Sequence, residues 1–136
     1  MFSLYLVIPC YNEQEVLHET SAQLKAKLEA LESSGKISGN SRIVFVDDGS
    51  KDRTWEIIEE LHRSSKIFQG IKLSRNRGHQ NALLAGLMTV KDRCDAVISL
   101  DADLQDDIDA IDEMTDKYLD CLLYTSPSPR DYAASR

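Results

Sequence analysis

Short apolar runs alternate along the chain with longer segments in which apolar residues recur at helical spacing. Aliphatic and β-branched runs that stop at polar residues predict buried strands, and apolar positions three or four apart predict amphipathic helices. Asn12 is a candidate cap for the first helix, and Asp52 or Thr54 for the second. The pattern predicts strands at 4–9, 42–46, 67–73 and 95–100, and helices at 17–31, 55–61, 81–90 and 108–119.

This alternation predicts an α/β fold with a mostly parallel sheet that is covered by helices on both faces. In open sheets of this kind, ligands bind beyond the carboxyl ends of the strands. Each predicted strand is followed by a polar cluster, and the four clusters read PCYNE, DDGS, SRNRGHQ and DADLQDD. Because parallel strands end at the same edge, we expect the four clusters to lie together.

The composition is typical of a soluble protein with one domain. The chain has 136 residues, 42% hydrophobic and 29% charged, and no apolar stretch reaches the length of a membrane span. A formal net charge of −7 argues against a protein that binds nucleic acid by neutralising phosphates. Cys10, Cys94 and Cys121 lack metal-ligand spacing, so free thiols are expected.

The periodic pattern stops at Cys121, where the text becomes CLLYTSPSPRDYAASR. We therefore predict a domain at 1–120 and a non-native or disordered tail at 121–136. The stretch CLLYTSPSPRD resembles the translation of a sequencing adapter read through at the end of a DNA fragment. On this interpretation the natural sequence differs after about Asp120.

Two aspartates, Asp101 and Asp103, follow the last predicted strand at spacing i, i+2. They point the same way if the extended backbone continues, and two convergent carboxylates suit a hard divalent cation, Mg²⁺ or Mn²⁺. An EF-hand is excluded, because Asp106 and Asp112 stand where its loop needs glycine and glutamate. A strand end followed by the acidic first turn of a helix is the alternative, and it accounts better for the later aspartates.

A dense cationic group precedes the predicted helix at 81–90. It consists of Lys72, Arg75, Arg77 and His79. A solvated surface cluster is one interpretation. The other is an anion site, because cations beside a helix N-terminus attract anions. Together with a divalent cation at the same edge, such a site would fit a diphosphate.

Two further features have local interpretations. Asp47–Ser50 suits a turn, although a carboxylate there can also accept a hydrogen bond from a base or a ribose hydroxyl. Trp55 is expected to belong to the core rather than to a stacking platform, and His18 and His62 are expected to be surface or partly buried residues on helices.

Four segments in this order resemble the nucleotide-sugar-binding half of family 2 glycosyltransferases. They read VIPCYNE, VFVDDGSKDRT, KLSRNRGHQNALLAGL and DAVISLDADLQD, and the resemblance covers residues 3–120. It is closest to the polyprenyl-phosphate branch, such as dolichyl-phosphate mannosyltransferases and bactoprenol glucosyltransferases. The resemblance implies a Rossmann-like GT-A fold, here truncated, and a role in cell-envelope glycan synthesis.

The resemblance also implies roles for individual residues. Asp101 and Asp103 are the implied catalytic residues, and Asp103 with Gln105 the implied ligands of Mg²⁺ or Mn²⁺ on the diphosphate. The implied nucleotide-sugar ligands are Pro9, Tyr11, Glu13, Asp48, Arg75, Gly78 and Asp101.

The implied reaction is inverting transfer from a UDP- or GDP-linked sugar to a polyprenyl phosphate. The attacking phosphate oxygen is already ionised at neutral pH, so no strong general base is required. The family's acceptor side and membrane anchor are expected after Asp120, on the cytoplasmic face of a membrane. We therefore expect the 136-residue chain to be a soluble fragment with little or no transfer activity.

Two other classes of function remain open from the sequence. A phosphatase of the haloacid dehalogenase type also has DxD after a strand, but it normally has Thr or Val where this chain has Gln105. The second alternative is a non-catalytic nucleotide-binding domain with the same fold.

Overall fold

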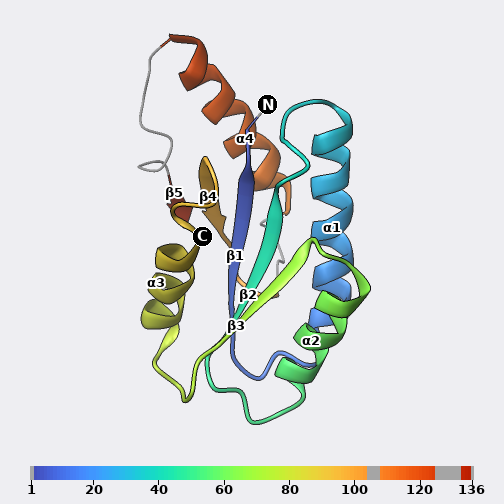
Figure 1. The fold of residues 1–136 in the computed structure, drawn as a ribbon, viewed down its shortest axis with the longest axis vertical. Coiled ribbons are helices and arrows are strands. Elements are labelled where there is room, and N and C mark those ends of the chain that lie inside the picture. Colours follow the sequence, from blue (N-terminus) through green and yellow to red (C-terminus); the bar gives the residue numbers. More distant parts are fainter. Residues whose placement is uncertain (1, 104–107, 125–132, 136) are drawn as a thin grey trace.

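The computed structural model describes residues 2–103, 108–124 and 133–135. Strands and helices alternate along these residues, as the apolar pattern predicts (Figure 1). The elements are β1 (Leu4–Cys10), α1 (Leu17–Ser33), β2 (Arg42–Asp47), α2 (Thr54–Ser64), β3 (Phe68–Lys72), α3 (His79–Val90), β4 (Ala96–Ser99), α4 (Ile108–Tyr124) and β5 (Ala133–Ser135).

The strands form one sheet in the order β3-β2-β1-β4-β5, and every neighbouring pair is parallel. The predicted parallel α/β fold is therefore confirmed. Parallel pairing brings the carboxyl ends of the strands to a common edge, which we call the carboxyl edge. The ends of β1, β2 and β3 meet there, at the bottom of Figure 1, where the chain turns toward the helices.

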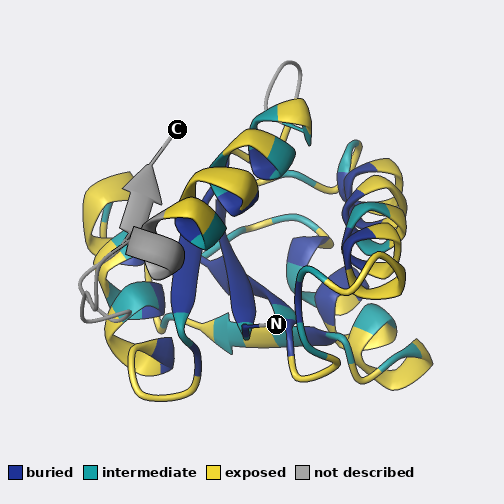
Figure 2. Cartoon of the chain, turned by 90° about the horizontal axis from the view of Figure 1, so that it is seen from above, coloured by how far each residue is buried: buried dark blue, intermediate teal, exposed yellow. Residues whose placement is uncertain are grey.

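Helices cover both faces of the sheet, with α1, α2 and α4 on one face and α3 on the other. Alternate strand residues serve the two faces: Leu6 and Ile8 pack toward α1 and α2, whereas Val7 and Val46 pack toward α3. Figure 2 shows the buried strands between helices whose outer surfaces are exposed. This packing fixes the carboxyl edge against a rigid core.

Close contact between α3 and the sheet depends on Gly86. A Cβ atom at this position would lie 2.6 Å from Val7 Cγ1 and 2.9 Å from Val46 Cγ2. Glycine therefore lets the helix approach β1 and β2 more closely than any larger residue would.

The observed elements differ from the predicted ones mainly at their ends. Helix α3 begins at His79, two residues before the predicted start, and α4 continues to Tyr124. Strand β5 pairs with β4 within the predicted tail, so two segments of 121–136 have regular structure. The described part of the chain contains no helix long and apolar enough to span a membrane.

Candidate functional site

A pocket of about 180 Å³ opens at the carboxyl edge between the loops that follow β1, β2 and β3. Four of its lining residues were predicted as ligands, namely Pro9, Tyr11, Asp48 and Gly78. Cys10 and Asn76 were not predicted, and His79 was predicted only as part of the cationic group. Cys10 continues β1 into the pocket and Asn76 lies in the loop after β3, positions that the parallel topology alone could have indicated.

Asp48 connects the three loops that form this pocket. Its side chain is buried at 3% exposure, and Oδ1 accepts a hydrogen bond from the Arg77 backbone N–H at 2.6 Å. Its own backbone N–H donates to the Cys10 carbonyl at 2.8 Å. A buried carboxylate needs such donors, so the loop after β3 is held by the loop after β2.

Gly49 permits the same two loops to approach each other. Its φ of 72° lies in the left-handed region, and a Cβ atom would lie 2.4 Å from Asn76 N and 2.6 Å from Arg75 C. Both the backbone conformation and the space therefore require glycine. The DDGS sequence thus combines a tight turn with a carboxylate at the pocket.

The first turn of α3 opens on the pocket through Gly78 and His79. Gly78 precedes the helix with φ 92°, and no side chain among the described residues caps this end. Unpaired N–H groups and the helix dipole favour an anion there.

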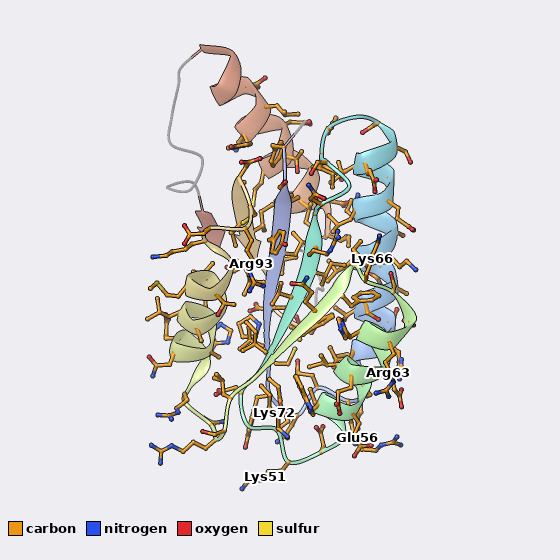
Figure 3. The ribbon with its side chains drawn as sticks, viewed as in Figure 1. Lys51, Glu56, Arg63, Lys66, Lys72 and Arg93 are labelled. Carbon is orange, nitrogen blue, oxygen red and sulfur yellow. The ribbon has the colours of Figure 1, made fainter. Side chains whose placement is uncertain are left out.

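The predicted cationic group is only partly brought together. His79 lines the pocket, whereas Arg75 and Arg77 are exposed in the loop before α3. The prediction that Lys72 belongs to this group is wrong, because its Nζ lies 5.7 Å from the centre of the Trp55 ring. Trp55 packs against the core on the α2 face, so Lys72 lies on that face too. Figure 3 labels Lys72 near the end of β3.

The aspartates after β4 lie in a turn and not in an extended strand. Strand β4 ends at Ser99, so the strand geometry on which their convergence was predicted is absent. Asp101 and Asp103 are nevertheless both exposed, on either side of the buried Ala102. The Ala102 carbonyl accepts a hydrogen bond from Thr20 Oγ1 at 2.6 Å, which anchors the turn to α1. Thr20 is a supporting residue that sequence reasoning missed.

The ionisation of Glu13 depends on these aspartates. Partial burial raises the pKa of Glu13, and the negative charges of Asp103, Asp52 and Asp101 raise it further. Carboxylates from the loops after β1 and β4 thus lie within electrostatic range of one another. Oxygen donors of this kind fit Mg²⁺ or Mn²⁺.

The described residues contain no group of three or more His, Cys, Asp or Glu side chains that could hold a metal ion by themselves. The predicted ligand Gln105 lies outside the described residues. The fit of a divalent cation therefore rests on Asp101 and Asp103 and on the chemistry of their oxygen donors.

Asn12 does not cap a helix. Its φ of 54° is left-handed, its backbone N–H donates to Ser50 Oγ at 2.9 Å, and its Oδ1 accepts from the Lys51 N–H at 2.9 Å. Helix α1 starts later, at Leu17, and no described side chain caps it. Asn12 instead fastens the loop after β1 to the loop after β2.

Cys10 and Cys94 are free thiols, as predicted. Burial raises the pKa of Cys10, with smaller contributions from Glu13 and Asp47, and burial raises that of Cys94 to about 11. The pocket-lining Cys10 is thus uncharged at neutral pH, and its Sγ donates to the Ile8 carbonyl at 3.4 Å. The side chain of Cys121 lies outside the described ones.

Residues 5–129 match the family described as Glycosyl transferase family 2. The chain belongs to this family. The Bacillus subtilis (strain 168) protein named "Uncharacterized glycosyltransferase YkoT" is 52% identical over 115 residues, which are 85% of this chain and 34% of that protein. The "Undecaprenyl-phosphate 4-deoxy-4-formamido-L-arabinose transferase" of Edwardsiella ictaluri (strain 93-146) is 45% identical over 101 residues, 74% of this chain and 29% of that protein.

The fold also matches a solved structure. The structure of S. aureus TarS 1-349 in complex with UDP-GlcNAc matches 86% of this family 2 chain and 32% of its own, with a TM-score of 0.60 and 19% identity. This likeness confirms the GT-A-like architecture. The family 2 chain spans about a third of the length of the relatives and structures that it matches.

Proposed function

We propose that this protein transfers a sugar from a UDP- or GDP-linked donor to a polyprenyl phosphate, with inversion at the anomeric carbon. The observation that carries the proposal is the pocket at the carboxyl edge, where Pro9, Tyr11, Asp48 and Gly78 converge. A lipid-linked acceptor places the reaction at a membrane surface, and we propose its cytoplasmic face. The undecaprenyl-phosphate transferase among the relatives supports this choice of acceptor.

The nucleoside of the donor would occupy the pocket. Asp48 Oδ1 is engaged by Arg77 N–H, which leaves the other carboxylate oxygen to accept from a base N–H or a ribose hydroxyl. Tyr11 is 40% exposed at the rim, where an aromatic ring can pack against a base. The complex of TarS with UDP-GlcNAc supports a nucleotide sugar as the ligand.

The diphosphate would lie between the first turn of α3 and the aspartates after β4. Gly78 and the N–H groups of α3 would approach its oxygens from one side, with Arg75 nearby. On the other side, Asp101 and Asp103 would hold Mg²⁺ or Mn²⁺, with Gln105 as a further ligand. When bound, the cation supplies neutralisation of the charge that develops on the leaving diphosphate.

The reaction itself requires little acid–base chemistry from the chain. An ionised phosphate oxygen of the acceptor attacks the anomeric carbon, and the bond from that carbon to the diphosphate oxygen breaks with its electron pair. The residues of the carboxyl edge bind and orient the donor, and orientation of this kind is a large part of catalysis. No proton has to be removed from the nucleophile.

Calorimetric titration of the chain with UDP-glucose, UDP-GlcNAc and GDP-mannose, each with and without Mn²⁺, tests this proposal. We expect saturable binding of at least one donor, strengthened by Mn²⁺. Asp103→Asn should remove the effect of Mn²⁺, whereas Asp109→Asn, in the exposed first turn of α4, should preserve it. If none of the three donors binds under any condition, the proposal is wrong.

A further inference from the structure

The loop after β1 and the loop after β2 are fastened together by side chains that each bind the backbone of the other loop. Besides the two bonds of Asn12, Glu13 N–H donates to Thr54 Oγ1 at 2.8 Å, and Gln14 N–H to Asp52 Oδ2 at 3.3 Å. In return, the Arg53 N–H donates to Gln14 Oε1 at 3.1 Å. We call this set of bonds the loop clamp.

Thr54 lies at the centre of the loop clamp. Its side chain is fully buried, and its hydroxyl accepts from Glu13 N–H while donating to Asp52 Oδ1 at 2.5 Å. Asp52 thereby orients the hydroxyl, so that its lone pair faces Glu13. Neither Thr54 nor Asp52 lines the pocket.

The segment held by the loop clamp faces two parts of the candidate site. Tyr11 lines the pocket, Asn12 turns the chain in a left-handed conformation, and Glu13 is within electrostatic range of Asp101 and Asp103. Asparagine enters the left-handed conformation more readily than most residues other than glycine, but at some cost, so contacts with its surroundings help to hold it there. The hydrogen bonds on both sides of Asn12 provide such contacts.

We infer that Thr54, oriented by Asp52, is a positioning residue that sets the Tyr11–Glu13 segment for nucleotide binding. The inference rests on the proposed function. Within the DDGSKDRT segment it assigns Asp48 to the pocket, and Ser50, Asp52 and Thr54 to holding the loop after β1.

A purely structural role for Thr54 is the competing explanation. Asp52 Oδ1 also accepts the Thr54 N–H at 2.9 Å at the start of α2, so loss of these groups weakens the helix end as well. The test must therefore separate nucleotide affinity from stability.

The experiment compares Thr54→Val, which keeps the shape but loses the hydroxyl, with Thr54→Ser, which restores it. Thr115→Val is the matched control, because Thr115 is also buried but its hydroxyl has no partner among the described residues. Affinity for UDP and GDP in the presence of Mg²⁺ is measured well below the melting temperature of each variant. Amide hydrogen exchange at Asn12 and Glu13 is measured on the same samples.

For Thr54→Val we expect roughly tenfold weaker nucleotide binding, as for loss of one buried hydrogen bond, and faster exchange at Glu13. Thr54→Ser should recover both properties, and Thr115→Val should change neither. If Thr54→Val melts earlier but binds as tightly as the wild type, the positioning role is wrong. If the wild type binds neither nucleotide, the proposed function fails and the inference fails with it, whatever the exchange data show.

Discussion

Glu13 is the residue whose ionisation reports most directly on the candidate site. Burial, Asp103, Asp52 and Asp101 raise its pKa in the folded state above the value of 4.5 for an isolated glutamate. Stability from this group is therefore fully present below the unfolded pKa and is lost as the pH rises through the folded pKa. At neutral pH, the ionised Glu13 disfavours the folded state.

Replacing Glu13 by glutamine should thus raise the melting temperature relative to the wild type at about pH 7 and have less effect at about pH 4. Thermal unfolding followed by circular dichroism at both pH values measures this difference. Glu19→Gln, an exposed position in the first turn of α1, serves as the control. An equal shift at both pH values would show that the neighbouring carboxylates do not act on Glu13.

Gly49 and Gly35 provide a matched pair for the turn at the pocket. Both have left-handed φ, 72° and 79°, but only a Cβ atom at Gly49 would meet backbone atoms, whereas that at Gly35 would meet nothing within 4 Å. Gly35→Ala should cost only the conformational penalty, about 1 kcal/mol. Gly49→Ala should cost at least about 1 kcal/mol more, because the loop after β3 must move. Chemical denaturation measures both, and similar costs would contradict the close approach.

Several residues that the sequence predicted as nucleotide-sugar ligands line the pocket, because their motifs directly follow strands. Asp48 and Tyr11 are examples, and their positions follow from the parallel topology. Asn12 and Lys72 were misassigned for physical reasons. The partners of Asn12 lie 38 and 39 residues further along the chain, and Lys72 points to the α2 face because strand side chains alternate. Local pattern carries no information about either contact.

At the scale of elements, the first turn of α3 lines the pocket, and Gly86 in the same helix packs against β1 and β2. Gly86→Ala gains about 1 kcal/mol in helix propensity but places a methyl group against Val7 and Val46, which costs about 1–3 kcal/mol in a packed core. We expect a net loss of stability on chemical denaturation.

Gly39→Ala is the control for this variant, because its new methyl group would meet only the flexible Glu32 side chain. A Gly86→Ala protein that is as stable as the wild type would show that α3 does not pack as closely as described.

The elements themselves were largely predictable, since buried parallel strands are continuous apolar runs and α1 has a clear helical period. The residues at which the elements begin and end were less predictable. Gly78, with φ 92°, allows α3 to begin at His79 directly after the loop. After Ser99, the buried Ala102 turns the chain toward Thr20, a tertiary contact that spans 82 residues. Such ends depend on distant partners rather than on local pattern.

At the scale of the whole molecule, charge is divided across the carboxyl edge. Residues 72–93 contain five of the sixteen Lys and Arg but one of the twenty-three Asp and Glu, although the chain carries −7 overall. Of these cations, only Arg75 and Arg77 lie in the loop beside the pocket, and the carboxylates of Glu13, Asp101 and Asp103 lie beyond β1 and β4. This polarity suits a diphosphate accompanied by a divalent cation.

A second hollow, of about 380 Å³, lies between α2 and the edge strand β3, and it shares no lining residue with the pocket at the carboxyl edge. Trp55, Gln69 and Arg93 line it, and Arg93 and Arg63 mark its surroundings in Figure 3. By volume alone this hollow is the better candidate for a ligand site, whereas the chemistry of the lining residues makes the pocket at the carboxyl edge the better candidate. The two locations make different predictions for ligand binding.

The most direct measurement is a titration of the isotope-labelled chain with UDP-GlcNAc and Mg²⁺, followed by amide chemical shifts. The central claim is that a nucleotide sugar binds at the carboxyl edge. It predicts saturable shifts at Tyr11, Asp48, Gly78 and Asp101, with little change at Gln69 and Arg93. Shifts centred on Gln69 and Arg93, or no shifts with UDP-GlcNAc or with GDP-mannose, would contradict it.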